Sequence, residues 1–237
     1  MFSFIVPCFN EGNSVKDTCN QIIKALKKLK KTKYEIIIIF DAGNNKTLNT
    51  VKKITKKNKK MKYFYNYKNL GFGGSVKKGI VNSRLKYIMW IPGDNSHPST
   101  EILKILRQSK NFDVVSTYYP NTKSRTLFRN LFTKSYTPLL NFLFRLNLPY
   151  YNGITIIKSK LLKNIIISTD SHNFAVEIWV KLNMHFNFTY KIIPTKLRDR
   201  KGGATAWKFT NSSKVLFNVI RLIFYFWYHK LFTVNLK

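Results

Sequence analysis

The sequence has 237 residues, of which 42 are lysine or arginine and 10 are aspartate or glutamate, so its formal net charge at pH 7 is +32. Its 44% hydrophobic and 15% aromatic content excludes a disordered chain, and its length is sufficient for one substantial core. The excess of positive charge favours an anionic partner, which is nucleic acid, a phospholipid surface or a phosphorylated substrate.

The cysteine content and the N-terminus indicate the compartment. Cys8 and Cys19 form no CxxC pair and no cysteine–histidine ligand spacing, which predicts neither a disulfide framework nor a zinc site and favours a reducing cytosol. The chain opens directly on the apolar residues 2–6, without the basic region of a secretory signal. We therefore expect a cytoplasmic protein whose first strand lies at these residues.

Apolar runs alternate with segments of helical periodicity through the first half of the chain. The expected strands are 2–6, 35–40, 63–65, 87–91 and 113–116, and the expected helices are 15–29, 48–54, 75–84 and 101–106. Strands separated by helices are typical of right-handed βαβ units, which predicts an α/β fold with a Rossmann-like, mostly parallel sheet flanked by helices. The loops that follow such strands open at one edge, where ligands bind.

One acidic residue is expected at that edge in a chain that has few acids. The apolar run 87–91 ends in Pro92 and Gly93, and Asp94 follows at once. Asp41 ends the second expected strand in the same way. Because carboxylates are scarce here, we interpret Asp94 as functional rather than as a solvated turn acid.

The pattern changes beyond residue 120. The expected elements are a basic helix rich in Phe and Leu at 125–145, a strand at 153–157, a helix at 174–182 and a strand at 190–193. The sequence contains no internal repeat and no linker composition. We therefore expect one domain over residues 1–210, followed by a separate terminal helix over residues 211–237.

The terminal helix is predicted to be amphipathic. Residues 215–228 are apolar except for Asn218 and Arg221, which fall with Tyr225 and His229 on one narrow polar stripe. The apolar run is shorter than the roughly 20 residues that cross a bilayer. We expect a helix that lies in the interface of an anionic membrane, with packing on the core or on a second subunit as the alternative.

Five short motifs connect the chain to a known family. They are VPCFNE at residues 6–11, FDAGN at 40–44, NLGFGG at 69–74 with Gly79, GDNSHP at 93–98 and RKGGAT at 200–205. Their order and spacing resemble the family 2 glycosyltransferases, and within them the dolichol-phosphate mannosyltransferase and polyprenyl-phosphate glycosyltransferase branch. The resemblance covers residues 2–206. It implies a GT-A fold, a nucleotide-sugar donor bound over the carboxyl edge of the sheet, and inversion at the anomeric carbon.

The resemblance also implies roles for individual residues. They are Pro7, Asn10, Glu11, Asp41, Gly71 and Gly93 for donor binding, Asp94 and Arg200 at the donor diphosphate, and Arg125, Arg129 and Ser135 for the acceptor phosphate. Asp94 would face the diphosphate through Mg²⁺ or Mn²⁺, and Arg200 would meet donor phosphate. Residues 1–119 would form the nucleotide-binding half and residues 120–210 the acceptor half.

The chemistry of such a transfer is compatible with few carboxylates. A leaving nucleoside diphosphate gains negative charge, which a metal ion or arginines stabilise. A lipid phosphate acceptor is already anionic and needs orientation more than a general base. A sugar hydroxyl acceptor would need a base, for which Glu177 is the candidate catalytic residue, and a salt bridge on a helix is the alternative role of this side chain.

Two positions depart from the pattern of the family. Pro92 stands where the first acid of Asp-x-Asp usually stands, so Asp94 would be the sole carboxylate ligand, with His97 or Asn95 as further candidates. Ala42 stands where the family often has a second acid that contacts the base. The resemblance therefore does not fix whether the donor carries UDP or GDP.

The leading hypothesis is transfer of a sugar from a UDP- or GDP-sugar to polyprenyl or dolichyl phosphate by a peripheral protein at the membrane face. The alternatives are a transferase for a glycan hydroxyl, a basic nucleic-acid-binding protein, and a family member that binds its donor without catalysis. Nucleic acid is not the expected partner, because the lysines are distributed over helices along the whole chain and are not concentrated on one surface. A homo-oligomer remains open.

Overall fold

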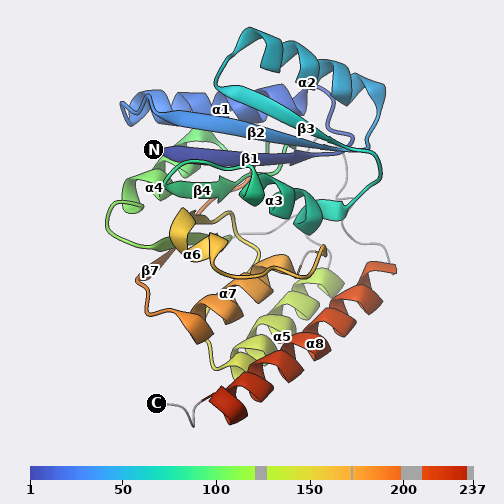
Figure 1. The fold of residues 1–237 in the computed structure, drawn as a ribbon, viewed down its shortest axis with the longest axis vertical. Coiled ribbons are helices and arrows are strands. Elements are labelled where there is room, and N and C mark those ends of the chain that lie inside the picture. The colour runs from blue at the N-terminus through green and yellow to red at the C-terminus, as the bar shows by residue number, and fades with distance from the viewer. Residues whose placement is uncertain (121–126, 172, 199–209, 234–237) are drawn as a thin grey trace.

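The computed structural model describes residues 1–120, 127–171, 173–198 and 210–233 (Figure 1). Within these residues a seven-stranded sheet has the order β3-β2-β1-β4-β6-β5-β7. The strands are β1 (Phe2–Cys8), β2 (Tyr34–Asp41), β3 (Met61–Asn66), β4 (Tyr87–Trp90), β5 (Val114–Tyr118), β6 (Ile156–Lys158) and β7 (Tyr190–Pro194). Since β6 is antiparallel to β4 and β5 while the other pairs are parallel, the mostly parallel sheet is confirmed.

Helices cover both faces of the sheet. They are α1 (Ser14–Lys28), α2 (Asn45–Lys57), α3 (Gly71–Val81), α4 (Ser99–Gln108), α5 (Leu127–Phe144), α6 (Ser159–Lys163), α7 (Phe174–His185) and α8 (Thr210–Thr233). The core on one face is formed with α1, α2 and α4, and the core on the other with α3, α6 and α7. The helices α5 and α8 lie side by side as an outer layer beyond α7 (Figure 1).

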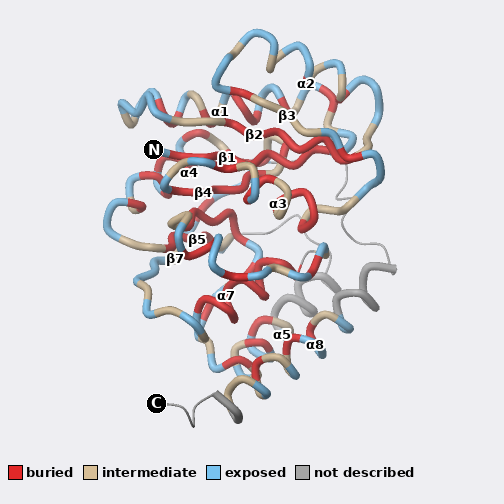
Figure 2. Tube along the Cα trace, in the orientation of Figure 1, coloured by how far each residue is buried: buried red, intermediate tan, exposed pale blue. Residues whose placement is uncertain are grey.

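The helices on both faces of the sheet explain why the apolar runs of the strands do not alternate with polar residues. On β1, Phe4 and Val6 belong to the core beneath α1 and α4, whereas Ile5 faces α3. Side chains on both faces of such a strand are buried, so both must be apolar. Figure 2 shows β1, β2 and β4 buried along most of their length.

β1 extends two residues further than predicted, through Pro7 to Cys8. In a parallel ladder the N–H and the carbonyl of one residue point to the same neighbour. The Pro7 carbonyl accepts from the N–H of Gly93, beyond Trp90 where β4 has ended. The N–H that proline lacks would therefore face a loop rather than a ladder partner, which allows proline in this central strand.

α3 begins at Gly71, four residues earlier than predicted. The carboxylate of Asp41 accepts hydrogen bonds from the N–H groups of Leu70 and Gly71, each over 2.9 Å, and so caps the first turn from a neighbouring strand. A Cβ atom on Gly73 would lie 2.5 Å from the Ser171 carbonyl oxygen. The glycine run is helical because it packs against another segment of backbone, and local periodicity does not reveal that contact.

Residues after position 120 contribute to the same sheet. β6 lies between β4 and β5, so the proposed nucleotide and acceptor halves share one set of strands. The strand predicted at 153–157 begins only at Ile156, and residue 153 lies against the end of β5. A Cβ atom on Gly153 would lie 1.9 Å from the Thr117 carbonyl oxygen. The short helix α6 was not predicted.

Candidate functional site

The loops after β1 and β4 meet at the carboxyl edge of the sheet. The N–H of Gly93 donates to the Pro7 carbonyl over 3.0 Å, which continues the pairing beyond the end of β4. A Cβ atom on Gly93 would lie 3.0 Å from both the Pro7 oxygen and the Cys8 Cβ, so a larger residue would push the loops apart. The structure thus brings together Pro7 and Gly93, two residues predicted for donor binding, and places Asp94 directly after them.

Asp94 is half-buried and its direction is fixed by its own loop. Its Oδ1 accepts hydrogen bonds from the Ser96 N–H over 3.0 Å and from the Ser96 hydroxyl over 2.6 Å. Asn95 has a φ of 58°, a left-handed conformation that asparagine tolerates. The Asn95 N–H donates to Thr18 Oγ1 on α1 over 2.9 Å. The loop is therefore tied to α1, and the carboxylate is preorganised at the edge.

The segment after β7 crosses this loop and adds a cation that the sequence analysis missed. The N–H of Arg198 donates to the Ser96 carbonyl over 2.9 Å. The Arg198 guanidinium donates to Asn95 Oδ1 over 3.5 Å and to Gln21 Oε1 over 3.4 Å, and the side chain is exposed. The sequence signal for this residue was its position two residues before Arg200.

Asp41 is buried at the neighbouring strand end. Its Oδ1 accepts from Asn66 Nδ2 over 2.8 Å and from the Leu70 N–H, while its Oδ2 accepts from the Gly71 N–H. Lys78 Nζ donates to Asn66 Oδ1 over 2.7 Å and completes this network. The structure therefore joins Asp41 to Gly71, and the aspartate fixes the connection between β3 and α3 at the same edge as Asp94.

Asn10 and Glu11 border this edge from the β1 loop. Asn10 Oδ1 accepts from the Asn44 N–H over 2.8 Å, and Asn44 caps α2 by accepting from the Thr47 N–H over 2.9 Å. The carbonyl of Glu11 accepts from the Ser14 N–H at the start of α1 over 3.0 Å. The loops after β1 and β2 are thereby held to each other and to the helices that follow them.

Two adjacent residues in the loop after β2, Ala42 and Gly43, allow this packing to be tested, because substitutions at them are expected to change stability differently. A Cβ atom on Gly43 would lie 1.5 Å from the Phe9 carbonyl oxygen, so Gly43→Ala is expected to lower the free energy of unfolding by about 1–3 kcal/mol. Ala42 has a φ of 55°, so Ala42→Gly is expected to leave the protein at least as stable. Urea unfolding measures both, and equal effects would contradict the close contact at Gly43.

His97 is buried three residues after Asp94. Burial lowers the pKa of its imidazole to about 4, so the ring is neutral near pH 7. Its Nδ1 has no hydrogen-bond partner among the residues that the structure describes, and its ring centroid lies 6.2 Å from that of Tyr119. A neutral imidazole can ligate a metal. Nevertheless, no group of three His, Cys, Asp or Glu side chains in the described ranges is placed to hold a metal ion.

A divalent cation would therefore have to share its coordination with a phosphate ligand. Asp94 supplies one preorganised carboxylate at the edge. Mg²⁺ is commonly held by one or two carboxylates together with waters and substrate phosphates. The residues present fit a cation of this kind, and they do not form a cage made of protein ligands alone.

Glu177 has a different environment, on α7, where it is 3% exposed. Its Oε1 accepts from the N–H and the hydroxyl of Ser168 and from Lys181 Nζ, over 3.0, 2.6 and 2.7 Å, and its Oε2 accepts from the Thr169 N–H over 2.9 Å. Burial raises the pKa of this carboxyl, but the hydrogen bonds from Lys181, Ser168 and Thr169 outweigh it and leave the pKa below its usual value. An ionised carboxylate with these partners is suited to anchoring a loop.

The residues predicted to bind the donor and acceptor phosphates are described only in part. Arg200, predicted for donor phosphate, and Arg125, predicted for the acceptor phosphate, lie outside the described residues, and only the backbone of Arg129 is described, as part of α5. Ser135 is exposed on the same helix. The acceptor phosphate site therefore stays a prediction.

Comparison with known proteins identifies relatives of the chain. A family model described as glycosyl transferase family 2 matches residues 3–166. An uncharacterized protein of Methanocaldococcus jannaschii is 25% identical over 193 residues, which cover 76% of this chain and 80% of that protein. The dolichyl-phosphate beta-glucosyltransferase of Dictyostelium discoideum is 35% identical over 100 residues, which cover 40% of this chain and 31% of that enzyme.

A solved structure shows the same fold. The glucosyl-3-phosphoglycerate synthase of Mycobacterium tuberculosis, in complex with Mn²⁺, UDP-glucose and phosphoglyceric acid, gives a TM-score of 0.64 at 10% identity and covers 86% of this chain and 72% of that chain. This likeness confirms the predicted GT-A fold. Because the family model matches more than half of the chain, this protein belongs to glycosyl transferase family 2.

Proposed function

We propose that this protein transfers a sugar from a nucleotide-sugar to a polyprenyl or dolichyl phosphate at a membrane surface, with inversion at the anomeric carbon. The observation that supports this most is the meeting of the β1 and β4 loops at Asp94, with Arg198 in contact with the β4 loop. Family membership supports glycosyl transfer, and the dolichyl-phosphate relative supports a lipid phosphate acceptor. The two buried free cysteines fit a reducing compartment such as the cytoplasmic face.

In this proposal the donor lies over the carboxyl edge of β1, β2 and β4. Asn10, Glu11 and Asp41 border the nucleoside, and Asp94 lies toward the diphosphate. A bound Mg²⁺ or Mn²⁺ would neutralise charge that develops on the diphosphate as the sugar leaves. Arg198 adds a guanidinium beside the same loop, where it stabilises an anionic leaving group without a change of protonation.

The acceptor supplies its own negative charge. An oxygen of the lipid phosphate forms a bond to the anomeric carbon while the bond from that carbon to the donor diphosphate breaks on the opposite face. The electron pair of the broken bond leaves with the nucleoside diphosphate, so the configuration inverts and no proton has to be removed. The hydrogen bonds that engage Glu177 agree with a reaction that needs no general base.

Calorimetric titration with UDP and GDP, each with and without Mn²⁺, tests the donor site. We expect one of the two nucleotides to bind, and to bind more tightly when the metal is present. Absence of binding under all four conditions would overturn the proposal, and tight, steeply salt-dependent binding of single-stranded RNA in its place would favour the nucleic-acid alternative.

A further inference from the structure

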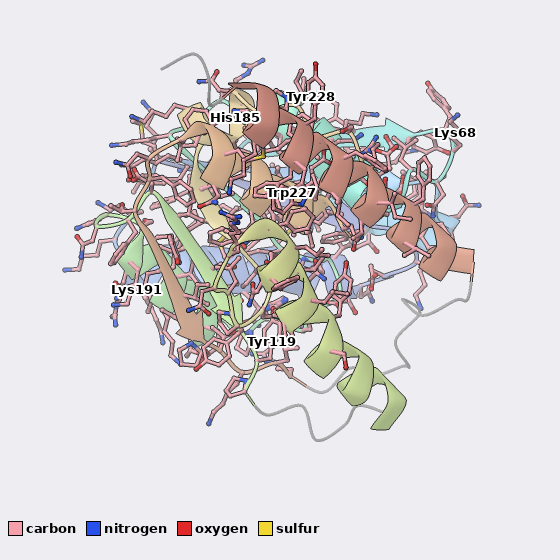
Figure 3. The ribbon with its side chains drawn as sticks, turned by 90° about the horizontal axis from the view of Figure 1, so that it is seen from below. Lys68, Tyr119, His185, Lys191, Trp227 and Tyr228 are labelled. Carbon is pink, nitrogen blue, oxygen red and sulfur yellow. The ribbon has the colours of Figure 1, made fainter. Side chains whose placement is uncertain are left out.

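The polar stripe of α8 lies beside the rest of the fold, and the side chain of Arg221 on this stripe is 43% exposed. Asn218 Nδ2 donates to Ser171 Oγ over 3.2 Å, and Arg221 lies 3.9 Å from the buried carboxylate of Glu177. One turn further, the Tyr225 hydroxyl is 2.9 Å from the imidazole of His185 on α7. Figure 3 shows His185 beside this helix. Three residues of the polar stripe, Asn218, Arg221 and Tyr225, therefore contact the rest of the fold, and Arg221 is also exposed to solvent.

A second side of α8, next to the exposed Arg221, is apolar and exposed. The exposed fractions are 62% for Leu216, 66% for Phe217, 43% for Ile220, 73% for Phe224 and 61% for Tyr228. These residues follow one another at steps of one, three, four and four, so they form a stripe along one helix face. Burial of Val219, Leu222 and Phe226 holds the helix to the core between the two stripes.

The helix α5 extends this apolar surface. On α5 Leu139 is 52% exposed and Phe142 is 81% exposed. The two helices are joined by the rings of Phe144 and Phe226, whose centroids lie 5.6 Å apart. Figure 3 shows α5 and α8 together on one side of the molecule, with Trp227 and Tyr228 on α8. We call the exposed side chains 139, 142, 216, 217, 220, 224 and 228 the α5/α8 surface.

Cations and aromatic residues border this surface. The Arg145 guanidinium lies over the Trp227 ring, 5.5 Å from its centroid, and Lys230 Nζ lies 5.6 Å from the same centroid. Arginine, lysine and tryptophan at the rim of an apolar face are typical of a surface at the level of lipid headgroups. No helix in the described ranges is long and apolar enough to cross a membrane.

We propose that the α5/α8 surface inserts into the headgroup and upper acyl region of an anionic bilayer. The occupant is a lipid rather than a second copy of the chain, because two copies that each carry a net charge of +32 repel one another whereas an anionic leaflet attracts the protein. The proposal rests on the lipid-phosphate acceptor proposed above and gives the side of the molecule from which that acceptor arrives.

A loop connects the helix α8 to the donor edge. Ser168 and Thr169 bind Glu177, and Ser171 binds Asn218 of α8. The carbonyl of Asp170, between them, accepts from the Gly74 N–H in the first turn of α3 over 3.3 Å. Because Asp41 caps that same turn, one continuous set of contacts joins the helix α8, which carries most of the α5/α8 surface, to the sheet edge. A bilayer held at this surface would have a fixed orientation relative to the donor site.

Cosedimentation of the full chain with lipid vesicles tests whether the α5/α8 surface binds a bilayer. The vesicles contain neither polyprenol nor donor, so the result does not depend on the transfer reaction. Vesicles of phosphatidylcholine with phosphatidylglycerol are compared with phosphatidylcholine alone. The variant Phe142→Glu/Phe224→Glu is compared with Val81→Glu/Ile166→Glu, which loses the same two units of net charge at side chains that are 79% and 83% exposed elsewhere. Removal of α8 is unsuitable, because three of its residues belong to the core.

We expect tight binding to the anionic vesicles, a roughly 100-fold loss in the Phe142/Phe224 variant and a much smaller loss in the control. Tryptophan quenching by brominated lipid should accompany binding, since Trp227 lies at the rim. Equal losses in the two variants would show that charge alone drives binding and would overturn the proposal. A dimer in sedimentation equilibrium that only the Phe142/Phe224 variant abolishes would also overturn it, in favour of a second copy of the chain.

Discussion

The Asp94→Ala variant is expected to transfer sugar about 10²–10³-fold more slowly than the wild type, while its fold is kept. The carboxylate stands at the edge where the β1 and β4 loops meet, and Ser96 holds it in one direction. Charge develops on the donor diphosphate as the sugar leaves, so the loss should appear mainly in kcat. Because Pro92 replaces the first acid of the usual pair, no neighbouring carboxylate in this motif can compensate.

The control for this variant is Asp17→Ala, which removes the same charge from an exposed position in the first turn of α1. Its rate should equal that of the wild type. Steady-state kinetics with and without Mn²⁺ should show that the Asp94 variant loses most of its response to the metal. A wild-type rate in Asp94→Ala would exclude the carboxylate from catalysis.

Glu177→Ala is expected to destabilise the protein by about 3–5 kcal/mol, because it leaves the ammonium of Lys181 buried without its ion-pair partner. The substitution also removes the acceptor of the Ser168 and Thr169 N–H groups. Unfolding by urea measures the loss. The double variant Glu177→Leu/Lys181→Met should recover part of it, because no unpaired charge then remains in the core.

The pH dependence follows from the lowered pKa of Glu177. A carboxyl group whose pKa is lower in the folded than in the unfolded state stabilises the fold above its unfolded pKa of about 4.3, and that contribution disappears as the pH falls through the folded value. Wild-type stability should therefore fall below about pH 4.3, and this component should be absent from the double variant.

The Glu177→Gln variant distinguishes a structural role of Glu177, as the residue that anchors a loop, from a catalytic role as a general base. At a temperature well below its midpoint of unfolding, we expect this variant to keep its rate of transfer to a lipid phosphate with lowered stability. If the variant stays folded and binds donor but has lost turnover, Glu177 is a general base and the glycan hydroxyl alternative gains support.

Much of the fold was predictable because the pattern was local. The apolar strand β2 and the helix α1, with apolar residues at helical spacing, lie within one or two residues of their predicted bounds. The start of α3 was wrong, because the bonds from Asp41 and the contact with Ser171 that shape it come from distant segments. Burial against non-local partners decides such positions, and periodicity does not encode it.

The candidate site was predictable to a similar degree. The apolar run that stops at Pro92 and Gly93 indicated the position of Asp94 at the sheet edge, because both faces of β4 are buried. Arg198 was missed because its contacts with Asn95 and Gln21 join segments more than 100 residues apart. For α8 the periodicity indicated a polar stripe, but it could not show that Asn218 and Tyr225 on that stripe contact the rest of the fold.

The central claim is tested most directly by incubating the full chain with Mn²⁺, UDP- or GDP-sugars and anionic vesicles that contain polyprenyl phosphate, and by analysing the lipid extract by mass spectrometry and NMR. The account predicts a polyprenyl phosphate sugar whose anomeric configuration is opposite to that of the donor, with formation that depends on Asp94. Retention of the donor configuration, or transfer to a soluble hydroxyl acceptor with none to the lipid phosphate, would contradict it.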